Sequence, residues 1–205
     1  MDIFATRVIP VIVINDPEDA QPLGEALVAG GLPIIEVTFR TPAAAECIAI
    51  MSEIEGLTVG AGTIVEPAQV ELAVEAGAKF LLSPGLRTDV VREARLAGRP
   101  IVPGAVTPSE IMTAQELGVE VVHFFPANVY GGAPTLGALA TLFPTMRFLP
   151  AGGLNASTIM DYLELPSVAA VGGSWVAPAD MIDAHEFAGI TGLCRQAVNI
   201  VASVA

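Results

Sequence analysis

The chain has 205 residues, of which 53% are hydrophobic and 15% charged, so it can bury a sizeable core and is not an extended disordered chain. Nine basic residues against 22 acidic ones give a formal net charge of −13, which repels nucleic acids and anionic lipid surfaces. We therefore expect a globular protein without nucleic acid or membrane as a partner. The length favours a single domain over residues 1–205.

The cysteines and the amino terminus bear on the compartment. Cys47 and Cys194 are far apart and form no C-x-x-C pair, so we expect reduced thiols and no structural zinc site. The chain begins Met-Asp-Ile-Phe without a basic segment followed by an apolar run, and its other apolar runs are broken by glycine, proline or charge. We expect a cytoplasmic protein.

Short apolar runs typical of strands alternate with helical stretches along the whole chain. The predicted strands are 8–14, 34–39, 58–61, 80–83, 100–102, 119–124, 147–150 and 169–172. Because strands this apolar need both faces covered, the repeat predicts a closed (β/α)₈ TIM barrel of the α/β class. An open doubly wound sheet is the alternative, disfavoured because no G-x-G-x-x-G follows the first strand.

The segments between the strands carry signals for helix starts and ends. Residues 16–19, Asp-Pro-Glu-Asp, predict an N-cap, a proline at the first helical position and early acids, and residues 107–110, Thr-Pro-Ser-Glu, predict a capping box. Glycines shortly before the next strand predict where helices end, at positions 30, 31, 77, 98 and 118.

The predicted second strand is polar on one face. With the period of two that strands follow, Glu36, Thr38 and Arg40 share one face, while the residues between them are apolar. The apolar face suits a layer of helices, so we expect the polar face to point into the barrel, where both charges need a partner or a ligand. An internal salt bridge between Glu36 and Arg40 is the alternative to a ligand site.

Two glycine pairs, 152–153 and 172–173, follow the predicted seventh and eighth strands. Glycine lets a ligand approach the backbone closely, and Asn155 can open a helix whose amino terminus favours an anion. Because the loops after strands seven and eight are the recurring phosphate site of this barrel, we expect phosphate binding here. Two ordinary turns are the alternative.

The chain has two histidines, in different settings. His123 lies at the carboxyl end of the predicted sixth strand, where barrel enzymes place catalytic groups, although a satisfied core histidine is the alternative. His185 lies beside acidic residues in the C-terminal helical stretch, where we expect an exposed side chain.

Seven short segments, spread over nearly the whole chain, occur together in one known family. They are Ile9-Pro10-Val11-Ile12, Glu36-Val37-Thr38-Phe39-Arg40-Thr41-Pro42, Gly60-Ala61-Gly62-Thr63, Ser83-Pro84-Gly85, Pro103-Gly104, Phe124-Phe125-Pro126-Ala127 and Gly172-Gly173-Ser174-Trp175. In order and spacing they resemble the 2-keto-3-deoxy-6-phosphogluconate (KDPG) aldolases, also called KHG/KDPG aldolases.

The resemblance implies a (β/α)₈ barrel, usually a homotrimer, without a bound cofactor. The family cleaves a phosphorylated 2-keto-3-deoxy sugar acid to pyruvate and glyceraldehyde 3-phosphate, or 4-hydroxy-2-oxoglutarate to pyruvate and glyoxylate. Glu36 then corresponds to the general acid/base, and Arg40 lies near the substrate carboxylate. The other implied substrate-binding residues are Thr63, Pro84 and Phe125 in the pocket and Gly152, Gly153, Gly172, Gly173 and Ser174 in the phosphate loops.

The chain departs from the family at the group that forms the Schiff base. The family has a lysine just before Phe-Phe-Pro, where this chain has His123, and an imidazole cannot form an imine. The one lysine, Lys79, begins the predicted fourth strand, roughly 13 Å of strand rise from the catalytic rim, so we expect an exposed charge there. Ala151 stands where the family commonly has a threonine.

Three functions remain open on these residues. The first is an aldolase with little or no Schiff-base activity, and the second is a lyase or enolising enzyme with Glu36 and His123 as an acid/base pair on a keto acid held by Arg40. The third is a non-catalytic binding or trimeric assembly subunit. The retained carboxylate, arginine and glycine loops favour a site for a phosphorylated keto acid or pyruvate. A metal-dependent aldolase is disfavoured because Glu36 and His123 are too few ligands.

Overall fold

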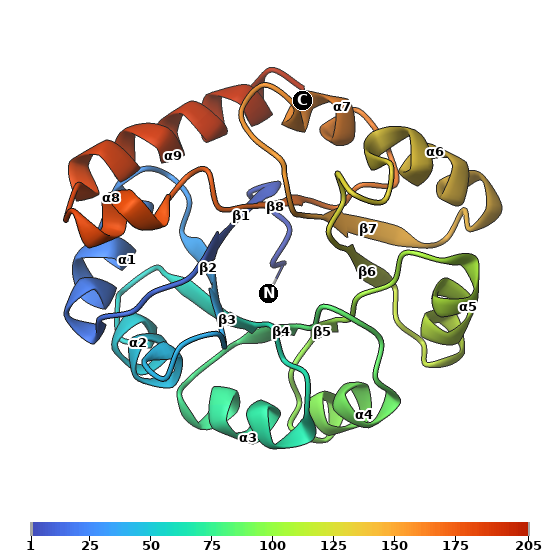
Figure 1. The fold of residues 1–205 in the computed structure, drawn as a ribbon, viewed down its shortest axis with the longest axis horizontal. Coiled ribbons are helices and arrows are strands. Elements are labelled where there is room, and N and C mark those ends of the chain that lie inside the picture. Colours follow the sequence, from blue (N-terminus) through green and yellow to red (C-terminus); the bar gives the residue numbers. More distant parts are fainter. Residues whose placement is uncertain (1, 205) are drawn as a thin grey trace.

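The computed structural model describes residues 2–204, which alternate between strands and helices around a ring (Figure 1). The strands are β1 Val8–Ile12, β2 Ile34–Thr38, β3 Thr58–Gly62, β4 Phe80–Leu82, β5 Ile101–Val102, β6 Val121–Phe124, β7 Arg147–Pro150 and β8 Val171–Gly173. The helices are η1 Pro17–Asp19, α1 Ala20–Ala29, α2 Ala44–Ser52, α3 Pro67–Glu75, α4 Thr88–Leu96, α5 Pro108–Glu116, α6 Gly132–Leu142, α7 Ile159–Leu163, α8 Ala179–Asp183 and α9 Phe187–Ala202. The domain predicted over 1–205 includes Met1 and Ala205, which lie outside the described residues.

The strands form one closed parallel barrel. Six strands pair in the order β5-β4-β3-β2-β1-β8, and β6 pairs with β7. Single bridges between Gly104 and His123 and between Ala151 and Gly172 join the two sheets on either side. The helices surround this ring in Figure 1, so the predicted (β/α)₈ barrel is confirmed and the open sheet is wrong.

The alternation along β2 separates two layers of core. Ile35 and Val37 are fully buried in the large cluster between strands and helices, whereas Glu36 and Thr38 take the other face. Inside the barrel a smaller apolar cluster fills the space, and it includes the first residues of β2 and β4. Its members are Ile3, Ile9, Ile34, Phe80, Leu82, Val102, Leu149 and Ala170.

Most helix boundaries follow the sequence signals. Thr107 and Glu110 form the predicted capping box of α5. Asp16 caps the short helix η1 rather than α1, because its side chain accepts from the N–H of Glu18 and a 3₁₀ turn precedes the α-helix. The predicted glycines follow the helix ends, and at Gly77 the backbone φ is 102°, a conformation that glycine adopts readily.

Asn155 does not open a helix as predicted. Its side-chain oxygen accepts from the N–H of Ser157 at 2.9 Å, so residues 155–158 form a turn and α7 begins only at Ile159. The helix has five residues, too few for a helical anion site after β7.

The single lysine lies at the amino end of the barrel, as predicted. Lys79 is exposed and directly precedes β4, where its backbone N–H donates to the Val59 carbonyl at 2.8 Å. No helix among residues 2–204 is long and apolar enough to cross a membrane.

Candidate active site

A cavity of about 520 Å³ opens at the carboxyl ends of the strands. Every residue predicted for the site lines it except Gly153, which is exposed beside it. The predicted residues that line it are Glu36, Arg40, Thr63, Pro84, His123, Phe125, Gly152, Gly172, Gly173 and Ser174. Strands far apart in sequence therefore bring the acid, the imidazole and the glycine loops to one place.

Glu36 extends from β2 into a space that is open because residue 62, on the neighbouring strand, is glycine. A Cβ atom at Gly62, on the neighbouring strand β3, would overlap the Glu36 carboxyl group. The residue is 2% exposed, and its Oε2 atom is buried without a hydrogen-bond partner. Burial raises the pKa of Glu36 from 4.5 to about 8, against a smaller lowering by the charge of Arg40. At neutral pH the carboxyl group is mainly protonated and can donate a hydrogen bond.

His123 ends β6 in the same cavity. Its Nδ1 lies 3.3 Å from the Ser83 carbonyl oxygen, which can only accept, so Nδ1 carries the hydrogen and Nε2 keeps a lone pair. Nε2 is buried and has no partner. The imidazole stacks on the Phe125 ring, with 5.2 Å between centroids. Burial lowers the pKa of His123 to about 4, against a smaller rise from the Ser83 contact, so the ring is neutral at pH 7.

Arg40 reaches the cavity from a turn rather than from the strand. β2 ends at Thr38, and the N–H of Arg40 donates to the Thr38 carbonyl at 2.8 Å. The period of two therefore stops before Arg40, although the side chain still lines the cavity. Among residues 2–204 no ion pair joins Arg40 to Glu36, so the salt-bridge alternative is wrong and the guanidinium is available to an anion.

The glycine loops shape one side of the cavity. Gly152 has a φ of 91°, and a Cβ atom there would meet Phe125 and Pro126 at 3.0 Å, so this position favours glycine. At Gly173 a side chain would overlap the ring of Trp175, which also lines the cavity. Gly153, in contrast, packs against the Asn128 side chain and contributes no lining.

Thr63 lines the cavity with an unusual backbone. Its φ is 58°, a left-handed conformation that β-branched residues rarely adopt. Strained conformations of this kind persist where the surroundings hold them, and they gather at ligand sites.

Several lining residues were not predicted. They are Val11, Val13, Ala151, Trp175, Ala177, Pro178 and Ala179, whereas Thr38, which also lines the cavity, lies on the inner face as expected. In the predicted first strand, residues 8–14, Val11 and Val13 share the face that does not carry the buried Ile12 and Ile14. A period-two analysis of that segment would therefore have found them. Residues 177–179 carry no such signal, because they reach the cavity through the path of the chain after β8.

The candidate metal ligands remain two. Among the described residues, no group of three or more His, Cys, Asp or Glu side chains comes together in a way that could hold a metal ion. Lys79 does not line the cavity.

A closed (β/α)₈ barrel with a buried carboxyl group, an imidazole and an arginine at its carboxyl end belongs to the class of barrel enzymes that act on small anions. A family model described as "KDPG and KHG aldolase" matches residues 2–193. The chain is therefore a member of the KDPG and KHG aldolase family.

Relatives match over nearly their whole length. The chain is 45% identical over 190 residues to the 2-dehydro-3-deoxy-phosphogluconate aldolase of Zymomonas mobilis, covering 93% of this chain and 90% of the relative. It is 44% identical over 193 residues to the KHG/KDPG aldolase of Escherichia coli K12, covering 94% and 91%.

Two solved structures show which ligands similar proteins bind. The Zymomonas mobilis ZM4 KDPG aldolase with 3-phosphoglycerate superposes with a TM-score of 0.92 at 43% identity, covering 100% of this chain and 99% of the other. The Legionella pneumophila KDPG aldolase, with pyruvate captured as a covalent carbinolamine, has a TM-score of 0.91 at 42% identity, covering 94% and 95%.

Proposed function

We propose that this protein cleaves KDPG or 4-hydroxy-2-oxoglutarate to pyruvate and an aldehyde by acid/base catalysis, without a Schiff base. One observation carries the proposal. Glu36 Oε2 and His123 Nε2 are both buried without a partner and line one cavity. Buried polar atoms left without partners are costly in a folded protein, and a polar ligand would supply both.

The rest of the cavity suits a phosphorylated 2-keto acid. Arg40, which pairs with no carboxylate among residues 2–204, provides a cation for the substrate carboxylate. The segments around Gly152 and Gly172–Ser174 let an anionic group approach the backbone. Similar proteins bind pyruvate and 3-phosphoglycerate, which represent the two ends of such a substrate.

The protonation states assign the two roles. Protonated Glu36 donates to the C2 keto oxygen, as a neutral carboxylic acid does in an apolar site. Neutral His123 accepts a proton at Nε2.

In the forward step, His123 Nε2 takes the proton of the C4 hydroxyl, and the C3–C4 bond breaks to release the aldehyde. The bonding electrons form a C2–C3 double bond while the C2 oxygen takes the Glu36 proton, leaving the enol of pyruvate. The His123 imidazolium then protonates C3 and Glu36 recovers the enol proton. Pyruvate leaves, and both groups regain their starting states.

A ketone accepts electrons less readily than a protonated imine, so we expect slow turnover. The test is an aldol-cleavage assay that couples pyruvate release to lactate dehydrogenase, with KDPG and 4-hydroxy-2-oxoglutarate in separate reactions. We expect a low rate that is unchanged by EDTA and exceeds that of the heat-denatured protein. A rate equal to that background, together with binding of 3-phosphoglycerate, would favour a binding subunit without catalysis. A rate abolished by EDTA would favour the metal-dependent mechanism.

We also propose a cytoplasmic homotrimer. Exposed apolar side chains around α5 and α6 support an interface between copies: Met112, Val129, Tyr130 and Leu142 are 55%, 73%, 48% and 65% exposed. Both cysteines are buried free thiols, which supports a reducing compartment. Light scattering should give three times the 21.1 kDa chain mass.

A further inference from the structure

A short segment forms the side of the cavity next to the β8 glycine loop. Residues 177–179, which we call the cavity wall, line the cavity, and α8 continues from Ala179. The Pro178 carbonyl accepts from the N–H groups of Met181 and Ile182, both at 3.1 Å. The wall and α8 are therefore joined by hydrogen bonds, and what holds the far end of α8 also holds the wall.

His185 holds that far end. Its N–H donates to the Ile182 carbonyl at 2.9 Å, and its Nδ1 lies 2.8 Å from Asp19 Oδ1. Asp19 ends η1, in the connection after β1, and Val13 of that connection lines the cavity. The pair therefore ties the connection after the last strand to the connection after the first.

Two observations set this pair apart from an ordinary surface contact. The Asp19 side chain is only 6% exposed although that of His185 is 69% exposed, and a buried carboxylate needs its partner. His185 has a φ of 56°, a left-handed conformation unfavourable for most side chains. A residue keeps such a backbone where its surroundings hold it there.

We propose that His185 is a positioning residue, whose pair with Asp19 holds the cavity wall against the phosphate-bearing end of the substrate. The identity of the ligand rests on the function proposed above. The wall follows Ser174 after two residues, and the N–H of Ala177 donates to the Ser174 carbonyl at 3.2 Å, whereas Glu36 and His123 serve the keto end. Losing the pair should therefore weaken binding of the phosphorylated end and leave the chemical step unchanged.

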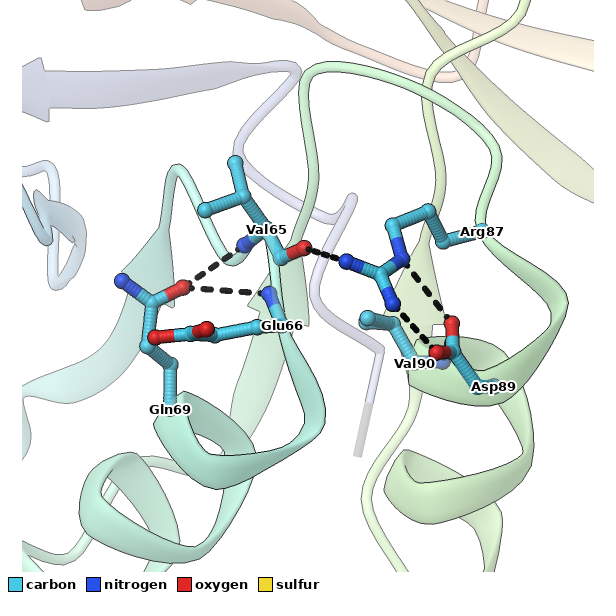
Figure 2. A network of polar contacts seen from close by, with 6 residues as sticks. All are labelled: Val65, Glu66, Gln69, Arg87, Asp89 and Val90. Carbon is cyan, nitrogen blue, oxygen red and sulfur yellow. Dashed lines mark hydrogen bonds and ion pairs between the residues drawn. The ribbon is translucent and has the colours of Figure 1, made fainter.

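The chain offers a matched control on the other side of the barrel. Arg87 pairs with Asp89 and its Nη1 donates to the Val65 carbonyl at 2.9 Å, which ties the connection after β4 to the one after β3 (Figure 2). Neither Arg87 nor Val65 lines the cavity. Arg87→Ala thus breaks a comparable tie between loops without touching the wall.

The experiment compares His185→Ala, His185→Asn and Arg87→Ala with the unmodified protein. Trp175 is the single tryptophan and lines the cavity, so its fluorescence can follow titration with 3-phosphoglycerate and with pyruvate. Amide hydrogen exchange of residues 177–186 in the free protein reports the wall directly. The kcat and KM for KDPG are measured for each variant and for the unmodified protein.

We expect His185→Ala to speed exchange in residues 177–186 and to raise the Kd of 3-phosphoglycerate and the KM of KDPG about three- to tenfold. The pyruvate Kd and kcat should stay within about twofold. Asparagine tolerates a left-handed backbone and keeps a donor, so His185→Asn should recover most of the loss. Arg87→Ala should leave the exchange of residues 177–186 and the Kd of 3-phosphoglycerate unchanged.

Unchanged exchange in His185→Ala, or equal weakening of pyruvate and 3-phosphoglycerate, would overturn the role of His185 alone. Failure of the unmodified protein to bind either ligand would overturn the proposed function and with it the positioning role.

Discussion

The two ends of the barrel are built from the same strands but hold opposite kinds of side chain. At the amino end Ile9, Ile34 and Phe80 pack into an apolar cluster inside the barrel. At the carboxyl end, Glu36 and His123 leave polar atoms unpaired in a cavity. Among residues 2–204 three buried side-chain polar atoms lack a partner, and two of them are these. The amino end therefore stabilises the fold, whereas the carboxyl end keeps buried polar atoms that lower stability and serve the chemistry.

The sharpest way to test this division is to return the missing amine to the carboxyl end. His123→Lys should raise KDPG cleavage by about 10³-fold or more, because an imine replaces the ketone as the electron acceptor. The coupled pyruvate assay measures it. Leu72→Lys is the control, since it adds a lysine at a side chain that is 52% exposed and outside the cavity, and it should gain nothing. No gain in His123→Lys would mean that the site lacks more than its nucleophile.

The amino end should respond in stability rather than in rate. Phe80 is fully buried and its ring covers Gly60, so Phe80→Ala should lower the free energy of unfolding by about 3–5 kcal/mol. Urea denaturation measures the loss. Lys79→Ala, at the exposed neighbouring residue, should change stability by less than about 0.5 kcal/mol and leave cleavage unchanged. A loss of cleavage in Lys79→Ala would contradict the placement of chemistry at the carboxyl end only.

Removing the acid should lower the rate and increase stability above about pH 4.5, where the unfolded chain would ionise Glu36. We expect Glu36→Gln to reduce cleavage about 100-fold, because an amide can donate a hydrogen bond to the keto oxygen but cannot protonate it. Glu71→Gln, on the exposed face of α3, is the matched control and should keep the full rate. Equal rates in both variants would exclude Glu36 as the acid.

The pH profile should reflect both groups. Activity requires neutral His123 and protonated Glu36, so the rate should rise as pH passes about 4 and fall as it passes about 8.

His123 and Glu36 make opposite contributions to the pH dependence of stability. His123 is protonated more readily when unfolded, so its contribution rises with pH between about 4 and 6.5. Glu36 retains its proton in the folded state, so stability falls between about 4.5 and 8, and Glu36→Gln should remove that fall.

The sequence was sufficient for the barrel because local signals and the global fold agree. The apolar strands, the capping box at Thr107 and the glycine at position 77 all fall where the structure has them. The period of two along the second strand correctly placed Glu36 on the inner face. It does not explain the position of Arg40, because the strand ends at Thr38 and a turn carries the guanidinium to the cavity.

Other parts of the site depend on contacts between distant segments, which no local pattern encodes. Sequence patterns did not predict that residues 177–179 line the cavity or that Asp19 pairs with His185. Both arise only when the connection after the last strand meets the connection after the first. His185 was expected to be exposed, and it is, yet its partner is buried. The turn at Asn155 prevailed over a helix because its side chain satisfies the backbone locally.

In the mechanism that we propose, the cavity activates a keto acid without a covalent imine. The most direct test follows exchange of the C3 protons of pyruvate in D₂O by NMR, alongside borohydride reduction of the protein with pyruvate and mass spectrometry. We predict exchange that depends on Glu36 and His123, with no added mass on this protein and an adduct on His123→Lys. An adduct on Lys79, or exchange that survives in both Glu36→Gln and His123→Ala, would contradict the account.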